Sequence, residues 1–169
     1  MNRITLWFLF FMPVASPLDQ KTFSVCDLLA HGAEQRGRIV SVRGSLHTGP
    51  EEFALYGLDC AFVLETSGYK WPTALWLTPP DGIPEEPVNF VVDKQAMKKF
   101  HKDLEKFQAA NPSSPIVPVV VVGKFEYPRK FVGGLGSNGK WVGNGYGHLN
   151  AYPGQIVIRL MRLDSSGGR

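Results

Sequence analysis

This 169-residue sequence has little excess charge of either sign, since 18 basic residues stand against 15 acidic ones and the formal net charge is +3. Nucleic-acid-binding domains usually carry a concentrated basic stripe, so this small excess does not predict that class of function. After residue 12 no apolar run approaches the roughly 20 residues that a membrane-spanning helix needs. The length fits a single domain with a substantial apolar core.

Sequence motifs that would indicate catalysis or a metal site are also absent. The histidines stand singly, without the spacing of a metal-binding pair: His31, His47, His101 and His148. No G-x-S-x-G elbow occurs, and the segment GGLGSNGKW has Trp141 where a phosphate-binding loop needs Ser or Thr. We therefore expect no catalytic residues, no metal and no cofactor. A metal-dependent nuclease or hydrolase that uses Asp59, His47 or His148 stays open as an alternative.

The N-terminus has the pattern of an export signal. A short positive region, Met1–Arg3, precedes the nine apolar residues of Ile4–Met12, and small residues follow in Val14–Ser16. Nine residues are too few to span a bilayer as a helix. We predict a signal peptide at residues 1–16, one domain at 17–164 and a flexible tail at 165–169. The mature protein is then expected in the periplasm or outside the cell.

Cys26 and Cys60 are the only cysteines, and both lie beyond the predicted signal. An even cysteine count in an exported chain favours a disulfide bond. The bridge would close a loop of about 35 residues and stabilise the fold by roughly 3 to 4 kcal/mol. Two free thiols, or two metal ligands, are the alternatives that the residues leave open.

The order of predicted elements indicates a mainly β fold. Ser24 and Asp27 have capping-box spacing at the start of a short helix that Gly32 would end. Strands are expected at 38–48, 51–60, 73–78, 116–127 and 155–163, with a long helix after Asp93. Gly44 marks a bend in the first strand. We expect a small five-stranded OB-like barrel, with a short N-terminal helix and one helix between strands three and four.

Three segments together resemble a group of uncharacterised exported bacterial proteins with an OB-fold-like barrel: VCDLLAHGAEQRGRIVSVRGSL, YGLDC and GYGHLNAYPGQIVIRL. In that group a Cys-bearing helix precedes the first strand, a second Cys follows strand two, and a G-x-G-H-x-x-x-Y-P segment leads into the last strand. The resemblance spans about residues 24 to 163. It implies the same topology and a Cys26–Cys60 pairing, and it brings no ligand or catalytic residue.

The segment from Gly133 to Gln155 is rich in glycine and in aromatic residues, and we expect neither a strand nor a helix in it. It would join strands four and five, one of the two connections with which OB-folds grip oligonucleotides and oligosaccharides. Its aromatic rings and cations suit stacking on sugars or bases. The competing interpretation is that these rings fold back over the barrel as architecture. The candidate ligand-binding residues are Arg43, Lys130, Lys140, Trp141, Tyr146 and His148.

The predicted function is that of an exported binding or interaction module whose ligand the sequence does not disclose. A carbohydrate, a peptide or an envelope protein is favoured as the partner, because the exported compartment holds little nucleic acid. A nucleic-acid-binding OB domain and a purely structural subunit remain alternatives. The latter would associate through an exposed apolar patch or sheet edge.

Overall fold

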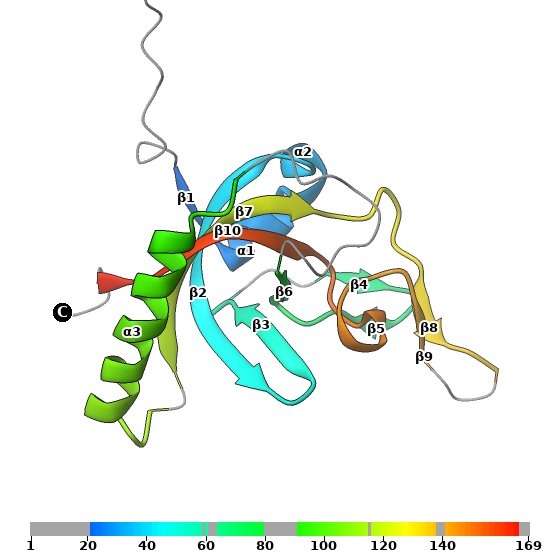
Figure 1. Ribbon diagram of the computed structural model, residues 1–169. Coiled ribbons are helices and arrows are strands. Elements are labelled where there is room, and N and C mark those ends of the chain that lie inside the picture. Colours follow the sequence, from blue (N-terminus) through cyan, green and yellow to red (C-terminus); the bar gives the residue numbers. More distant parts are fainter. Residues whose placement is uncertain are drawn as a thin grey trace, which may run out of the picture.

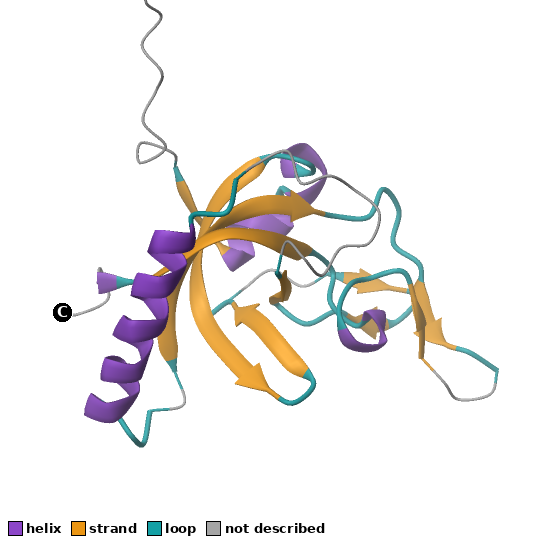
Figure 2. Cartoon of the chain, viewed as in Figure 1, coloured by secondary structure: helices purple, strands orange, loops and turns teal. Residues whose placement is uncertain are grey.

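The computed structural model describes residues 21–58, 60, 64–79, 91–114, 116–137 and 141–165 (Figure 1). Strands dominate the described chain, as Figure 2 shows. The helical elements are α1 (Val25–Ala30), α2 (Gly32–Gln35), α3 (Lys94–Ala110) and the short 3-10 turn η2 (His148–Asn150). The strands are β1 (Thr22–Ser24), β2 (Ile39–Gly49), β3 (Glu52–Tyr56), β4 (Glu65–Thr66), β5 (Tyr69–Lys70), β6 (Ala74–Thr78), β7 (Val117–Glu126), β8 (Gly133–Leu135), β9 (Trp141–Gly143) and β10 (Gln155–Leu163).

Five of these strands pair in a closed ring. β2 pairs with β3, β3 with β6, β6 with β10, β10 with β7, and β7 returns to β2. The β6–β10 pairing is parallel and the other four are antiparallel. Each of the five therefore has two neighbours, and β1, which pairs with β2, is the sixth strand of the same sheet. This closure gives every strand of the ring a hydrogen-bonded partner on each side over at least part of its length.

Strand β2 exchanges partners near its middle, which is where the sequence placed a bend. Residues 41–43 lie between β1 and β7, whereas residues from Ser45 onward pair with β3. A Cβ at Gly44 would come within 2.6 Å of the carbonyl oxygen of Tyr56 and 2.8 Å of the side chain of Leu55. Only glycine permits this close approach, so the strand can pass from one set of neighbours to the other.

The ring encloses an aliphatic core because alternate residues of each strand point inward. Helix α1 and the Phe100 side chain of α3 complete this core. The N-terminus of α3 is capped by Asp93, whose carboxylate accepts a hydrogen bond from the Ala96 amide at 2.9 Å. The fully enclosed side chains include Val25, Leu28, Leu29, Val40, Val42, Leu55, Leu75, Val119, Val121, Phe125 and Ile156.

The structure corrects the sequence prediction in two respects. The described residues contain ten strands and not five, because β1, β4, β5, β8 and β9 are only two or three residues long and too short to show alternation. Gly32 does not end the first helix, which stops at Ala30, but begins α2. A Cβ at Gly32 would lie 2.4 Å from the ring of Tyr127, so this glycine is needed for packing.

The predicted disulfide is present between Cys26 of α1 and Cys60, with the two Cα atoms 5.5 Å apart. It holds α1 against the chain that follows β3, and Gly57 packs directly on both sulfur atoms. In the part of the chain that the structure describes, none of the helices has the length and apolar character that crossing a bilayer requires. The predicted signal, residues 1–16, and the tail beyond Ser165 lie outside the described residues.

Candidate functional site

Residues 127–154, which connect β7 to β10, are called the connecting segment here. They are not a bare loop, because they contain the β8–β9 hairpin and η2, and Tyr146 forms a β-bridge with Tyr152. The sequence prediction that this segment would hold no strand is wrong. Figure 1 shows the hairpin projecting on the side of the molecule opposite α3.

The connecting segment lies against the outer faces of β3 and β6. Tyr152 is 8% exposed and packs with Ala54 and Ala74, which are completely buried outside the main core. Its ring centroid lies 5.3 Å from that of Trp76 on β6. Because Ala54 and Trp76 are paired neighbours on adjacent strands, one tyrosine covers both. The small alanine side chains leave the room that this ring fills.

A shared carboxylate fixes the tyrosine in place. The Tyr152 hydroxyl donates a hydrogen bond to Oε1 of Glu52 at 3.1 Å, and the Tyr56 hydroxyl donates to the same oxygen at 2.6 Å. Burial, followed by the bond to Glu52, raises the pKa of Tyr56 well above its ordinary value. Burial likewise raises the pKa of Tyr152. Both phenols therefore stay protonated and act as donors across the neutral pH range.

Two glycines allow the segment to approach the sheet. Gly147 has φ +70°, and a Cβ there would lie 2.3 Å from the ring of Trp76. A Cβ at Gly145 would meet the carbonyl oxygen of Tyr152 at 2.3 Å and the ring of Trp71 at 2.7 Å. Phe131 also packs on Trp71, with ring centroids 5.1 Å apart. The glycine-rich composition is thus explained at these two positions by contact with aromatic rings.

The turn between β2 and β3 meets η2 beside Trp76 and leaves a shallow groove of about 350 Å³ between them. Trp76 gives it an aromatic wall, Phe53 also borders it, and Glu51, Glu52 and His148 supply polar groups. Nε2 of His148 lies 3.5 Å from Oε2 of Glu51, so the two connections touch at this point. Both of these side chains are exposed, with 46% and 76% of their surface accessible. The groove therefore combines flat apolar surface with accessible hydrogen-bonding groups.

The structure brings only some of the candidate residues to this groove. His148 lines it, and Tyr146 lies nearby as the half-buried bridge partner of Tyr152. Arg43 is in the half of β2 that pairs with β1 and β7, whereas the groove is at the other end of that strand. Lys130 is exposed near the hairpin, where its carbonyl oxygen accepts a hydrogen bond from Asn144. Lys140 and the side chain of Trp141 lie outside the described residues.

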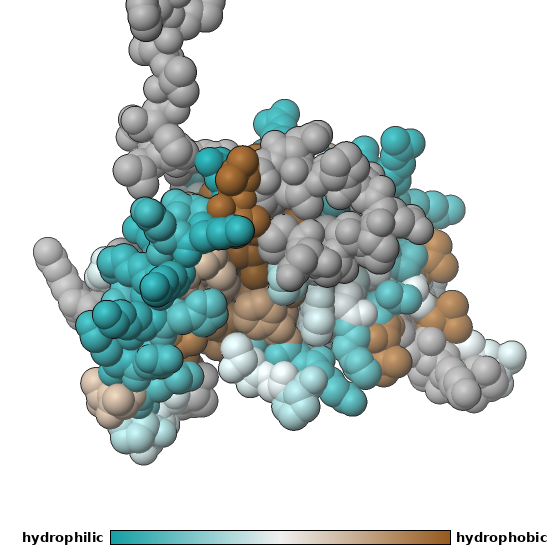
Figure 3. Space-filling view, in the orientation of Figure 1, coloured by the Kyte–Doolittle hydropathy of each residue, from teal (hydrophilic) through white to brown (hydrophobic). Residues whose placement is uncertain are grey.

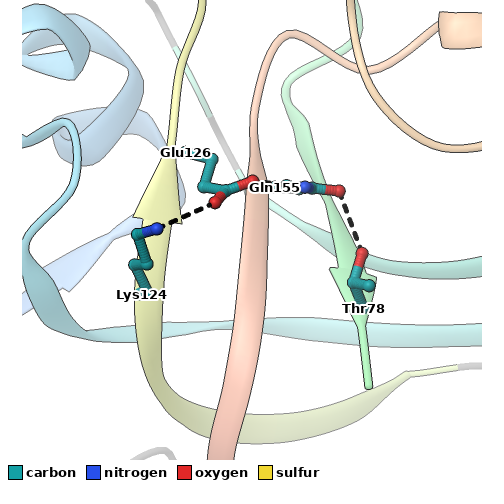
Figure 4. A network of polar contacts seen from close by, with 4 residues as sticks. All are labelled: Thr78, Lys124, Glu126 and Gln155. Carbon is teal, nitrogen blue, oxygen red and sulfur yellow. Dashed lines mark hydrogen bonds and ion pairs between the residues drawn. The ribbon is translucent and has the colours of Figure 1, made fainter. Parts of the chain in front are cut away.

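A polar network crosses three strands on the outer side of the ring (Figure 4). Thr78 Oγ1 donates to Gln155 Oε1 at 2.9 Å, and Gln155 Nε2 donates to Glu126. Lys124 Nζ lies 3.3 Å from the other oxygen of Glu126. Burial and the negative charge of Glu126 raise the pKa of Tyr146 to about 12. Each member of the network is satisfied by another, so the network joins β6, β10 and β7 structurally.

Of the groups named for metal-assisted hydrolysis, the two histidines have different partners. His47 stacks on Tyr56, with ring centroids 4.3 Å apart, and His148 faces Glu51. Asp59 lies outside the described residues. Within the described ranges, no three residues of the His, Cys, Asp and Glu types gather as a metal-binding group.

No family model, no curated protein and no solved structure matches this chain. The assignment of the candidate site is therefore based on the geometry of the described residues alone.

Sequence reasoning missed Glu52, Tyr56 and Trp76, which form the centre of this region. A signal for them exists, because Glu52 and Tyr56 alternate with the inward-facing Phe53 and Leu55. Trp76 likewise lies between the buried Leu75 and Leu77. Outward-facing aromatic residues on two neighbouring strands indicate that something covers or binds that face.

Proposed function

We propose that this protein is an exported binding module, built on an OB-like barrel, whose ligand occupies the groove between the β2–β3 turn and η2. The closed ring of five strands, in the order β2-β3-β6-β10-β7 with α3 before β7, supports the barrel assignment. The disulfide supports export, since such bonds persist in oxidising compartments. Membership of the exported bacterial group that the sequence resembles is part of the same proposal.

The observation that carries the proposal is the composition of the groove. The aromatic ring of Trp76 stands beside the Glu51 carboxylate and the His148 imidazole, which remain accessible at the rim. Carbohydrates offer flat apolar ring faces for stacking and hydroxyl groups for hydrogen bonding, so this combination suits a sugar. Glu51 and Glu52 make the rim acidic, which disfavours a polyphosphate chain. We therefore place a carbohydrate ahead of a nucleic acid as the ligand.

The covering of β3 and β6 by Tyr152 restricts where the ligand can lie. OB-folds commonly bind on this strand face, between the two flanking connections. Here the face is already filled by Tyr152, and Ala54 and Ala74 have no exposed surface. The ligand then occupies the outer margin, where both connections contribute one exposed side chain, Glu51 and His148. Trp141 remains a proposed additional contact.

The test is a screen of soluble oligosaccharides against the wild type, followed by calorimetric titration of each hit. Glu51→Ala and His148→Ala remove rim contacts while leaving the aromatic packing untouched, and each should weaken binding about tenfold, as for the loss of a hydrogen bond to a charged group. Glu65→Ala is the matched control, because Glu65 is an exposed acid on β4 outside the groove. Its affinity should equal that of the wild type.

A salt titration separates the two ligand classes. Stacking on a neutral sugar should hardly respond to added salt, whereas binding to a phosphate backbone weakens steeply. An affinity that collapses with salt, or that is the same in Glu51→Ala, His148→Ala and the wild type, would contradict a carbohydrate site in this groove.

A further inference from the structure

A second hollow lies beneath helix α3, and it shares no lining residue with the groove. It has a volume of about 460 Å³ and lies between the first half of α3 and the strands β10, β7, β2 and β1. Among the described residues its apolar lining is formed by Ala96, Phe100, Val122, Leu160 and Met161. Figure 3 shows apolar atoms beside the hydrophilic outer surface of α3. A volume and lining of this kind are typical of sites for small molecules.

Two arginines of β10 also line this cavity. The register of β10 against β7 shifts between Ile158 and Leu160, so Arg159 is the extra residue of a bulge. A bulge takes a side chain out of the regular alternation and turns it in a new direction. The carbonyl oxygen of Arg159 also accepts a hydrogen bond from the Asp93 amide at 3.0 Å. The bulge thus attaches the start of α3 and presents an arginine beside it.

The arginine of the bulge is incompletely satisfied. Its Nε atom is buried and makes no hydrogen bond. The ion pairs found within the described residues involve neither Arg159 nor Arg162. Buried polar atoms are nearly always hydrogen-bonded, and a charged group without a partner is the most costly exception. This atom therefore indicates that an acceptor belongs in the cavity.

The carboxylates that line the cavity are already engaged. Asp93 accepts a hydrogen bond from the Ala96 amide as the N-cap of α3. Asp103 pairs with Lys99 one helical turn away. Lys99 and Asp103 thus neutralise each other, and the two guanidinium groups outweigh the single remaining carboxylate of Asp93. The remaining electrostatic character is positive, above an apolar floor.

We propose that this cavity binds an amphipathic anion, a carboxylate with an unbranched apolar tail. The head group would lie against Arg159 and Arg162, since the planar guanidinium matches a carboxylate in shape and charge. The tail would lie along Phe100, Leu160 and Met161. This site does not depend on the carbohydrate groove, because different elements form the two.

The experiment titrates the full-length mature protein with decanoate, with decanol as the neutral analogue, by isothermal calorimetry. Decanoate should bind at one site, and at least tenfold more tightly than decanol. Arg159→Gln and Arg162→Gln, which keep much of the side-chain bulk without the charge, should each weaken decanoate binding at least tenfold and leave decanol binding unchanged. Arg38→Gln is the matched control, because Arg38 is exposed and outside the cavity, and its decanoate affinity should equal that of the wild type.

A second variant guards against misfolding of the arginine substitutions. Ala96→Leu fills the cavity from α3 with another good helix-forming residue, so it should fold and reduce the affinity for both probes. Equal binding of decanoate and decanol, unchanged binding in Arg159→Gln and Ala96→Leu, or no heat of binding for decanoate would each overturn the proposal. The proposal would also be overturned if Arg38→Gln weakened decanoate binding as much as Arg159→Gln does.

Discussion

The interior of the strand ring and the aromatic patch on its outside are built on different physical principles. The interior consists almost entirely of aliphatic side chains from five strands and α1, and burial stabilises it together with the disulfide that holds α1. The patch contains Tyr56, Trp76 and Tyr152, and it depends on a shared carboxylate and on glycines that fit against rings. Burial has no direction, whereas hydrogen bonds and ring contacts do. The patch should therefore be weaker overall and more sensitive to small changes in geometry.

The largest expected effect tests the interior. Replacing both cysteines, Cys26→Ser with Cys60→Ser, releases α1, whose Val25, Leu28 and Leu29 are part of the core. The free energy of unfolding should fall by roughly 3 to 4 kcal/mol, as expected for a loop of this length. Urea denaturation followed by circular dichroism measures it. The wild type with a reducing agent should give the same value, and a loss below about 1 kcal/mol would contradict the structural role assigned to the bond.

An intermediate effect tests the patch. Gly147→Ala places a Cβ against Trp76 at a residue with φ +70°, so we expect a loss of about 2 to 3 kcal/mol from strain and overpacking. Because the interior is untouched, the loss should appear as local opening. Hydrogen exchange of the Tyr146 and Tyr152 amides, which bond to each other's carbonyl oxygens, should become faster.

The matched control is Gly134→Ala in the hairpin of the same segment. A Cβ at Gly134 meets nothing within 4 Å and its φ is not positive, so exchange and stability should stay close to those of the wild type. Equal effects of the two substitutions would contradict the role assigned to the close contact between Gly147 and the Trp76 ring in the patch.

The smallest effect concerns alkaline pH. Burial raises the pKa of Tyr56 and Tyr152 in the folded state, so their contribution to stability is complete below the unfolded pKa near 10. It is lost as the pH rises above that value, because the unfolded chain releases these protons first. Tyr152→Phe should lower stability by about 1 kcal/mol at neutral pH and flatten the decline between pH 10 and 12.

The measurement is the free energy of unfolding at a series of alkaline pH values, with ultraviolet absorbance reporting phenol ionisation. Tyr69→Phe is the control, since Tyr69 lies in the separate β4–β5 hairpin. Tyr69→Phe should leave the loss of stability at alkaline pH unchanged. If it flattens that loss as strongly as Tyr152→Phe does, the burial of Tyr152 beside Glu52 is not the cause of the loss.

The predicted elements that the structure confirms are those with a long, regular pattern. The helix after Asp93, the strand at 73–78 and the last strand at 155–163 lie within a residue or two of the expected positions. The β-branched run at 116–127 became β7, with two neighbours as a central strand has. The short strands were missed, because two or three residues contain too little alternation to distinguish them from turns.

The candidate site was predicted only in outline. The sequence placed the candidate residues largely in the connection between strands four and five, and the structure brings η2 of that connection to the β2–β3 turn through Glu51 and His148. The sequence did not indicate that Tyr152 would cover β3 and β6, or that Arg43 would lie toward the other end of β2. Nor did it single out Arg159, whose position depends on a bulge in the pairing of β10 with β7.

By itself the sequence determined the mainly β class, the order of the long elements and the cap of α3, and it favoured a bond between its two cysteines. These depend on local spacing, on capping chemistry and on a count of two, all of which can be read along the chain. Tertiary structure alone decided which outward-facing residues became neighbours. Glu52, Tyr56 and Tyr152 meet across a separation of up to 100 residues, and Arg159 faces α3 through a register shift. Such contacts depend on how strands pair, and pairing is a property of the whole fold.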